Sequence, residues 1–187
     1  MVLRENSYDL SKLKSFGDDV YINSMCEIVR PSDVEIGSHV AIDFGFFIST
    51  KATIGDFIHI GPHVSAIGGE SAKLVLANLT SIAAGVRLIC YGDEHKGAGI
   101  VGALIPKKYQ DKRIGGQIEV KEFAAIGTNA VIGPGVTLGE GCVIAANSYV
   151  NQNTEPWLIY GGSPARVIGS RPRENIINFA KEMGYLK

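Results

Sequence analysis

The chain has 187 residues, with 18 Lys and Arg against 19 Asp and Glu and a formal net charge of −1. This balance excludes the class of nucleic-acid-binding proteins that hold phosphate groups through a basic patch. The three cysteines are widely spaced and odd in number, which predicts reduced thiols. We expect a cytoplasmic protein, because no apolar signal segment is found, and no membrane insertion, because no apolar run of about 18 residues is found.

The first element that we expect is a small helix in residues 7–16, and a repeat begins near residue 20. Aliphatic side chains then recur at every sixth position in three runs: Ile36, Ile42, Ile48, Ile54 and Ile60; Leu76, Ile82 and Leu88; and Val120, Ile126, Ile132, Leu138, Ile144 and Val150. A second series of mostly small or aliphatic residues lies four positions into each hexad: Ile22, Ile28, Val34, Val40, Phe46, Ala52, Ile58, Val64, Ala124, Ala130, Val136, Cys142 and Ser148.

A period of six matches neither the 3.6-residue period of a helix nor the two-residue period of a strand. It fits a coil that turns a corner every six residues, so that every sixth side chain points inward. Stacked coils of this kind pair their backbones about 4.8 Å apart and bury a continuous aliphatic column. Glycine follows many of the aliphatic residues, and we expect it to permit both close approach and the dihedral angles of the corner. The repeat therefore predicts an all-β, coiled parallel fold.

The register of the repeat slips twice. The first slip, around the sequence IGGESAKL, predicts a bulged corner. The second spans residues 91–117, which are polar, rich in glycine and without a period. A loop of this length in a compact domain is usually functional or disordered, so we expect residues 91–117 to protrude from the coil and to carry function.

The tail leaves the repeat after residue 155. Residues 156–170 are rich in turn-forming residues, and residues 171–187 predict a short amphipathic helix in which Ile176, Ile177, Ala180 and Met183 share one face and Gly184 ends the helix. This tail would cover the open end of the coil. The chain therefore divides into a coiled domain, residues 1–170, and a helical tail, residues 171–187.

The hexad repeat and the ending GGSPARVI, residues 161–168, resemble the hexapeptide-repeat acyltransferases. Within that family the chain is similar to galactoside and maltose acetyltransferases and to sugar acetyltransferases of bacterial polysaccharide synthesis. The resemblance implies a left-handed β-helix that forms a homotrimer, with acetyl-CoA in the groove between coils. It also implies acetyl transfer to a hydroxyl or amine of a sugar or nucleotide-linked amino sugar. O- and N-acetylation both stay open.

The resemblance places the catalytic histidine in the protruding loop, and His95 is the histidine found there. Acyl transfer from a thioester requires a base for the acceptor proton, and imidazole suits this task because its ordinary pKa is about 6.5. We therefore expect His95 to be the general base. Asp93 is the candidate for orienting its ring, with Glu94 and Asp43 as alternatives.

The resemblance also implies four cofactor-binding residues: Thr128, Ala146, Asn151 and Arg166. Arginine after the proline turn suits a phosphate group of CoA. The family often has Thr-Lys where this chain has Asn151-Gln152, which removes one positive charge. A second basic residue is replaced by Gly169, so Arg171 or Arg173 would have to substitute for it.

Two alternatives remain beside this reading. Metal-dependent carbonic anhydrases share the fold, and His59, His63 and His95 could in principle supply three zinc ligands. His59 and His63 occupy non-equivalent positions in adjacent hexads, however, so we expect no metal. The other alternative is a trimeric scaffold without catalytic activity, which CoA would not stabilise.

Overall fold

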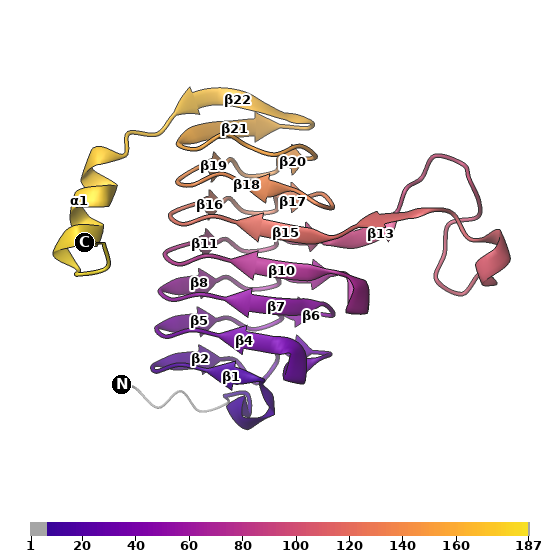
Figure 1. The fold of residues 1–187 in the computed structure, drawn as a ribbon, viewed down its shortest axis with the longest axis horizontal. Helices are drawn as coiled ribbons and strands as arrows, with labels where there is room; N and C mark the ends of the chain where they lie inside the picture. The colour runs from indigo at the N-terminus through magenta and orange to yellow at the C-terminus, as the bar shows by residue number, and fades with distance from the viewer. Residues whose placement is uncertain (1–6, 187) are drawn as a thin grey trace.

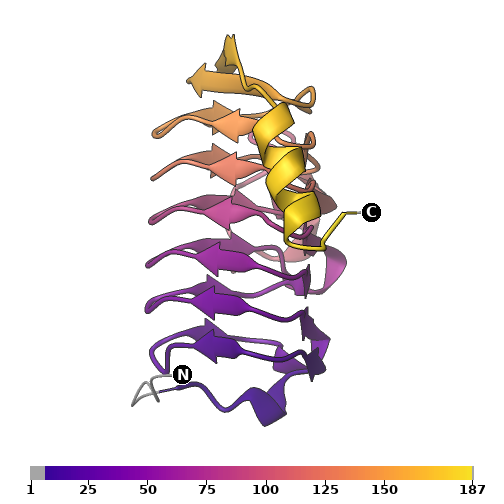
Figure 2. The same cartoon turned by 90° about the vertical axis from the view of Figure 1, so that its left-hand side faces the viewer.

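The computed structural model describes residues 7–186 as a stack of coils with three flat sides (Figures 1 and 2). Each side is a sheet, and the pairing between successive coils is parallel. The first sheet contains β1 (Ser15–Phe16), β4 (Val34–Ile36), β7 (Lys51–Ile54), β10 (Lys73–Leu76), β15 (Gln117–Val120) and β18 (Thr137–Leu138). The second contains β2 (Val20–Ile22), β5 (Val40–Ile42), β8 (Ile58–Ile60), β11 (Ser81–Ile82), β16 (Ala125–Ile126), β19 (Val143–Ile144), β21 (Leu158–Gly162) and β22 (Ala165–Ser170). The third contains β3 (Glu27–Ile28), β6 (Phe47–Ile48), β9 (Ser65–Ile67), β12 (Arg87–Ile89), β17 (Val131–Ile132) and β20 (Tyr149–Val150).

The interior of the stack is the pair of hexad columns that the sequence predicts. Every position of the first series is buried, as is every position of the second. A side chain such as Ile132 lies above Leu88 because their strands pair in register, and Val150 continues the same column. Full burial of one such side chain contributes about 1.5–3 kcal/mol. The predicted all-β coil with a protruding loop and a C-terminal helix is confirmed.

The chain turns at three edges, which we name by what they carry. The helix edge joins the first sheet to the second at residues 37–39, 55–57, 77–80, 121–124 and 139–142. The Thr128 edge joins the second sheet to the third at residues 43–46, 61–64, 83–86, 127–130 and 145–148. The loop edge joins the third sheet to the first at residues 29–33, 49–50, 68–72, 90–116 and 133–136.

The glycines that follow the aliphatic residues serve one of their two predicted purposes. Close approach is confirmed, because a Cβ on Gly61 would lie 2.8 Å from the backbone nitrogen of Ala84 in the next coil. The predicted part of these glycines in the dihedral angles of the corner does not take the form of a left-handed backbone. That conformation falls two residues later, at His63 and Asn129, both with φ of 58°. The chain completes its turn around the edge at this second residue after the glycine, and the left-handed dihedral angles are found there.

Departures from the regular hexad lie on the loop edge. A 3-10 turn, Pro31–Asp33, precedes β4, and a second, Gly69–Ser71, precedes β10. The second confirms the bulged corner expected near IGGESAKL. The largest departure, residues 90–116, leaves the stack between β12 and β15 as a projecting arm (Figure 1). Because strands before and after each departure still pair in register, the added length does not disturb the core.

Helix α1 (Glu174–Glu182) runs down the outside of the helix edge (Figures 1 and 2). Glu174 in its first turn and Lys181 in its last turn suit the helix dipole. Gly184 follows with φ of +73°, as expected of a glycine that ends a helix. Ala180, on the face predicted to be apolar, is 3% exposed.

The end of the tail is fastened to the middle of the stack. The Tyr185 ring meets the Phe57 ring edge-on, with centroids 6.0 Å apart, and the Asn78 side-chain amide donates to the Tyr185 hydroxyl. The guanidinium of Arg171 donates to the carbonyl oxygens of Phe123 and Gly141 at 2.7 and 3.1 Å. The tail therefore covers one edge of the prism over several coils, and the predicted cover of the open end is provided by the β21–β22 hairpin.

The predicted N-terminal helix is only a 3-10 turn, Leu10–Lys12. Asp9 caps this turn by accepting from the backbone N–H of Ser11 at 3.1 Å. The turn ends at once because Leu13 is buried and the chain continues into β1, which pairs with β4. Within residues 7–186, no helix is long and apolar enough to cross a membrane.

Candidate active site

The projecting arm is ordered at its base by a two-stranded antiparallel ribbon, β13 (Tyr91–Asp93) and β14 (Arg113–Gly115). Arg113 Nε lies 3.3 Å from Asp93 Oδ1, and the Arg113 guanidinium also lies over the Tyr91 ring, 5.9 Å from its centroid. Residues 91–117 therefore do protrude as expected, but their base is regular structure. Asp93 binds across this ribbon, so its carboxylate stabilises the root of the arm.

His95 lies just beyond the ribbon and is exposed, with a left-handed backbone at φ of 59°. Its backbone N–H donates to Asp111 Oδ2 at 3.0 Å. Of the three carboxylates considered for orienting its ring, Asp93 pairs with Arg113 and Glu94 pairs with Lys96 at 3.0 Å. Among the described residues, no carboxylate is bonded to the His95 imidazole.

The third of those carboxylates, Asp43, belongs to another histidine. His59 Nε2 lies 2.9 Å from Asp43 Oδ2 on the outer face of the second sheet, where Ser81 is the neighbour of His59 in the next coil. This is a base and an orienting carboxylate at hydrogen-bond distance. The pairing was missed from the sequence, although the two residues are about one coil apart, which is the signal that could have revealed it.

The remaining histidines lie on edges. His39 Nδ1 is 3.2 Å from Asp19 Oδ2, and the His63 ring meets the Phe44 ring edge-on at 4.7 Å. His59 and His63 thus leave from a strand and from an edge, as their positions in the hexads predict. In the part of the chain that the structure describes, no three His, Cys, Asp or Glu side chains form a group that could hold a metal ion.

Two of the predicted cofactor contacts occupy equivalent places on the Thr128 edge. Thr128 and Ala146 are both exposed and lie in successive coils. The carbonyl oxygen of Thr128 accepts from the backbone N–H of Asn147 at 2.9 Å, which stacks one turn on the other. The result is an open ladder of small side chains along which an extended molecule could lie.

The other two predicted contacts share one cavity. Asn151 and Arg166 both line a hollow of about 200 Å³ at the C-terminal end of the stack, together with Tyr160 and Ala165. Arg166 is exposed and uses one N–H for the carbonyl oxygen of Ala165, which leaves further donors of its guanidinium for an anion. Donors of this kind fit the phosphate groups of CoA. The two arginines suggested as substitutes lie elsewhere: Arg171 is bonded on the helix edge, and Arg173 lines a different cavity.

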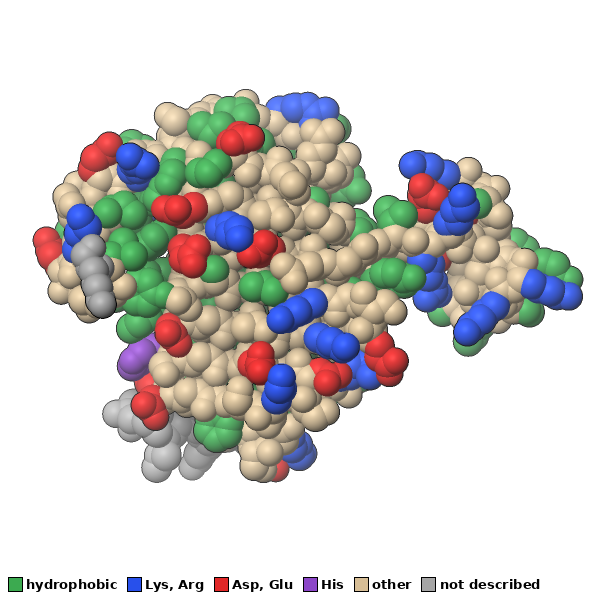
Figure 3. Space-filling view, viewed as in Figure 1, with side chains coloured by type: hydrophobic (Ala, Val, Ile, Leu, Met, Phe, Trp, Pro, Cys, Tyr) green, Lys and Arg blue, Asp and Glu red, His purple; other side chains and the backbone are tan. Residues whose placement is uncertain are grey.

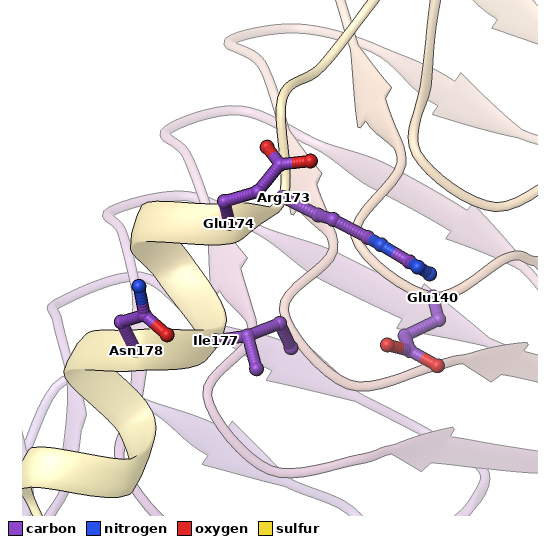
Figure 4. A pocket seen from close by; sticks show the side chains of 5 residues that line it. All are labelled: Glu140, Arg173, Glu174, Ile177 and Asn178. Atoms are coloured by element: carbon purple, nitrogen blue, oxygen red, sulfur yellow. The ribbon is translucent and has the colours of Figure 1, made fainter.

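That different cavity is the larger, at about 440 Å³, and it lies between α1 and the turn that carries Glu140 (Figure 4). Glu174, Ile177 and Asn178 line it from the helix, and Arg173 and Ile177 extend toward the Glu140 side. Apart from Arg173, one of the two suggested substitutes, no predicted site residue lines it. It has two carboxylates on its walls, Glu140 and Glu174, against one, Glu155, in the smaller hollow, which makes it the less suitable of the two for the anionic CoA.

The three buried cysteines contribute no nucleophile. Cys26, Cys90 and Cys142 are free thiols inside the stack. Burial raises the pKa of Cys90 to about 12, so this group stays protonated near neutral pH. Cys90 is therefore a small residue packed in the core.

The prism of hexad coils is the fold expected of a hexapeptide-repeat acyltransferase, and comparison with known proteins gives the same class. The family model described as bacterial transferase hexapeptide (six repeats) matches residues 118–152. The chain belongs to the hexapeptide-repeat acyltransferases, and among sugar-modifying members it is similar over almost its full length to the N-acyltransferase AntD from Bacillus cereus. A single-residue variant of AntD, solved with dTDP-4-amino-4,6-dideoxyglucose and Coenzyme A, is 30% identical with a TM-score of 0.89 and covers 96% of this chain and 98% of its own.

Two curated relatives give a similar picture. The dTDP-4-amino-4,6-dideoxy-D-glucose acyltransferase of Escherichia coli is 27% identical over 164 residues, which are 86% of this chain and 84% of that protein. A probable macrolide acetyltransferase of Lysinibacillus sphaericus is 32% identical over 131 residues, 65% of this chain and 71% of that protein. Both relatives are acyl-group transferases, in agreement with the enzyme class predicted from the sequence.

Proposed function

We propose that this enzyme transfers an acyl group from a CoA thioester to the amine of a nucleotide-linked amino sugar, with dTDP-4-amino-4,6-dideoxyglucose as the first acceptor to test. The observation that carries the proposal is the similarity to AntD, which extends over 96% of this chain. A variant of AntD was solved in complex with that sugar nucleotide and with CoA. Acetyl-CoA is the expected donor. The product would serve bacterial surface polysaccharide synthesis, and we place the enzyme in the cytoplasm, where both substrates are made.

We assign the donor to the Thr128 edge and the adjoining hollow. Thr128 and Ala146 would face the extended pantetheine arm, because they are exposed, small and stacked in successive coils. Asn151 and Arg166 would hold the phosphate end, because both line the arginine-bearing hollow. A guanidinium–phosphate contact is among the stronger polar interactions available to a surface site.

In the reaction, the acceptor nitrogen attacks the thioester carbonyl carbon, the carbon–sulfur bond breaks and the CoA thiolate leaves. The nitrogen must lose a proton as the new bond forms. We propose His95 as the base that takes it, because its ring is exposed and it lies on the arm. Asp93 would support it indirectly, by fixing Arg113 and thus the ribbon from which His95 extends.

We propose that the working enzyme is a homotrimer in which the arm of one subunit lies against the next. The arm stands clear of its own prism, with basic and hydrophobic side chains on its surface (Figure 3). Leu104 at its tip is 99% exposed, and Ile100 and Val101 beside it are 57% and 47% exposed. Apolar groups so displayed are typical of a surface that a partner covers. A second subunit would bring its Thr128 edge within reach of His95.

The test of the enzyme class measures CoA release with a thiol reagent. Acetyl-CoA is offered with dTDP-4-amino-4,6-dideoxyglucose, with free amino sugars, with simple sugars and with a macrolide. We expect turnover with the sugar nucleotide. Turnover with the macrolide alone would favour the second candidate, a macrolide acetyltransferase, for which the 32% identity to the Lysinibacillus protein is the supporting observation. No thiol release with any acceptor would refute the proposal.

The test of the base compares two histidines. His95→Ala should lower kcat by about 100-fold or more, the usual contribution of a general base, with little change in CoA affinity. His59→Ala is the matched control, because His59 is also exposed and has a carboxylate partner at 2.9 Å. If the control loses turnover and His95→Ala keeps it, the base is His59 and our assignment is wrong.

A further inference from the structure

Asp111 is the least expected buried side chain of the arm. It is 5% exposed, although it lies in a projecting polar segment between Gln110 and Lys112. Removing a carboxylate from water is costly unless hydrogen bonds replace the lost hydration. The surroundings of Asp111 therefore have to provide such hydrogen bonds, and the donors of these bonds identify the part of the arm that Asp111 holds in place.

The Asp111 side chain binds backbone rather than other side chains. Its Oδ2 accepts from the backbone N–H of His95 at 3.0 Å, and its Oδ1 accepts from the backbone N–H of Lys112 at 2.9 Å. Its own N–H donates to the carbonyl oxygen of Ile100 at 3.1 Å. One residue thus joins three passes of the arm, those that contain residues 94–96, 99–101 and 110–112.

His95 needs such support because its backbone is left-handed. A residue with a Cβ at φ of 59° is strained unless its surroundings fix it there. The bond from Asp111 fixes the N–H of that residue, and the neighbouring bond from the N–H of Glu94 to the carbonyl oxygen of Lys112, at 2.7 Å, holds the same turn from the other side. The direction in which the imidazole leaves the arm is set by this backbone.

We propose that Asp111 is the positioning residue of the site, which aims the imidazole of His95 by holding the backbone of His95 instead of its ring. The inference rests on the proposed function, since it takes His95 to be the base. It assigns to Asp111 the orienting role that was predicted for Asp93, Glu94 or Asp43, which are bonded to Arg113, Lys96 and His59 instead.

The experiment is a double-mutant cycle between Asp111 and His95, measured as kcat and as KM for both substrates. Asp111→Ala should lower kcat by about 10- to 100-fold, the effect of a small misplacement of a reacting group, with both KM values unchanged within about twofold. Asp111→Asn should recover part of the loss, because its side-chain oxygen can still accept from the N–H of His95. In the His95→Ala background, the change at Asp111 should have almost no effect on kcat, because it acts through the missing ring.

Hydrogen exchange gives a readout that does not need activity. The amides of His95 and Lys112 should exchange faster in Asp111→Ala than in the wild type, while strands of the prism keep their protection. Glu70→Gln is the matched control, because it removes a carboxylate from another departure on the loop edge and should change neither kcat nor these amides.

The outcomes separate the two proposals. A wild-type enzyme without thiol release refutes the proposed function. An active wild type in which His95→Ala keeps its turnover leaves the enzyme class standing and overturns the role of Asp111. Losses that multiply in the double variant, or unchanged kcat and amide exchange in Asp111→Ala, overturn it too. If Asp111→Ala does not fold, Asp111→Asn carries the same cycle.

Discussion

Gly141 offers a prediction in which one added methyl group can be followed through the structure. It lies on the helix edge at φ of +61°, and a Cβ there would lie 2.4 Å from Trp157 Cε3 and 2.5 Å from Cζ3. Phe57 and Phe123 take the same left-handed conformation in other coils, so the backbone angle alone does not require glycine. The indole ring of Trp157, which packs over this position, is what excludes a side chain.

The expected cost of Gly141→Ala has two parts. A left-handed backbone costs a residue with a Cβ about 1–2 kcal/mol. Displacing the Trp157 ring from its packing costs about 1–3 kcal/mol more, as for other overpacked sites. The ring cannot withdraw freely, because the carbonyl oxygen of Trp157 accepts from the backbone N–H of Arg171 at 2.8 Å. We therefore expect a loss of about 2–5 kcal/mol in the free energy of unfolding.

Gly135→Ala is the matched control, since Gly135 has φ of +74° and nothing within 4 Å of a Cβ. It should lose only the backbone part, about 1–2 kcal/mol. The assay is urea unfolding followed by the fluorescence of Trp157, the one tryptophan of the chain, at a fixed protein concentration. If Gly141→Ala is as stable as the control and keeps the native emission, the ring does not fill the space and the reasoning fails.

Three further predictions concern the tail, the core and the donor site. Tyr185→Phe leaves the amide N–H of Asn78 without its acceptor and should lower the free energy of unfolding by about 1 kcal/mol, and an unchanged urea midpoint would contradict this. Burial raises the pKa of Cys90 to about 12, from about 9 in the unfolded chain. The stability that the protonated thiol contributes is therefore complete below pH 9 and is lost as the pH rises from 9 toward 12. Because the thiol is buried, iodoacetamide should label Cys90 only in urea, as read by mass spectrometry. Arg166→Ala should weaken CoA binding by about 10-fold or more in calorimetry, whereas the control Arg173→Ala should leave the affinity unchanged. Equal effects of the two substitutions would show that Arg166 does not bind the donor.

The sequence predicted the columns of the core because their signal is repeated many times. Each hexad contributes one inward aliphatic residue, and the regular spacing leaves few other folds that could bury them all. The arm was predicted for the opposite reason, as the long stretch where the period stops. The tail helix followed from its apolar face and from Gly184, and the structure ends α1 at Glu182.

What the sequence did not reveal depends on contacts between coils or on single backbone bonds. His59 and Asp43 meet only after the chain has passed around all three sheets, so their pairing needs the length of each coil. Asp111 is one polar residue in a polar stretch, and its burial arises from the way the arm folds back on itself. The left-handed residues of the edges, such as His63 and Asn129, were not predicted, because the glycines at the close-packed position are the more conspicuous signal in the sequence.

The position of the loop edge has a consequence for how such an enzyme can change. Extra residues at Pro31–Asp33, at Gly69–Ser71 and in the arm enter on one side of the prism, while the Thr128 edge keeps one spacing from coil to coil. The part proposed to grip the donor is thus mechanically separate from the part that can grow, shrink or be exchanged. An arm transplanted from a relative at this edge would exchange the segment that carries His95 and leave the residues assigned to the donor, Thr128, Ala146, Asn151 and Arg166, unchanged, which makes the two halves of the proposed site modular.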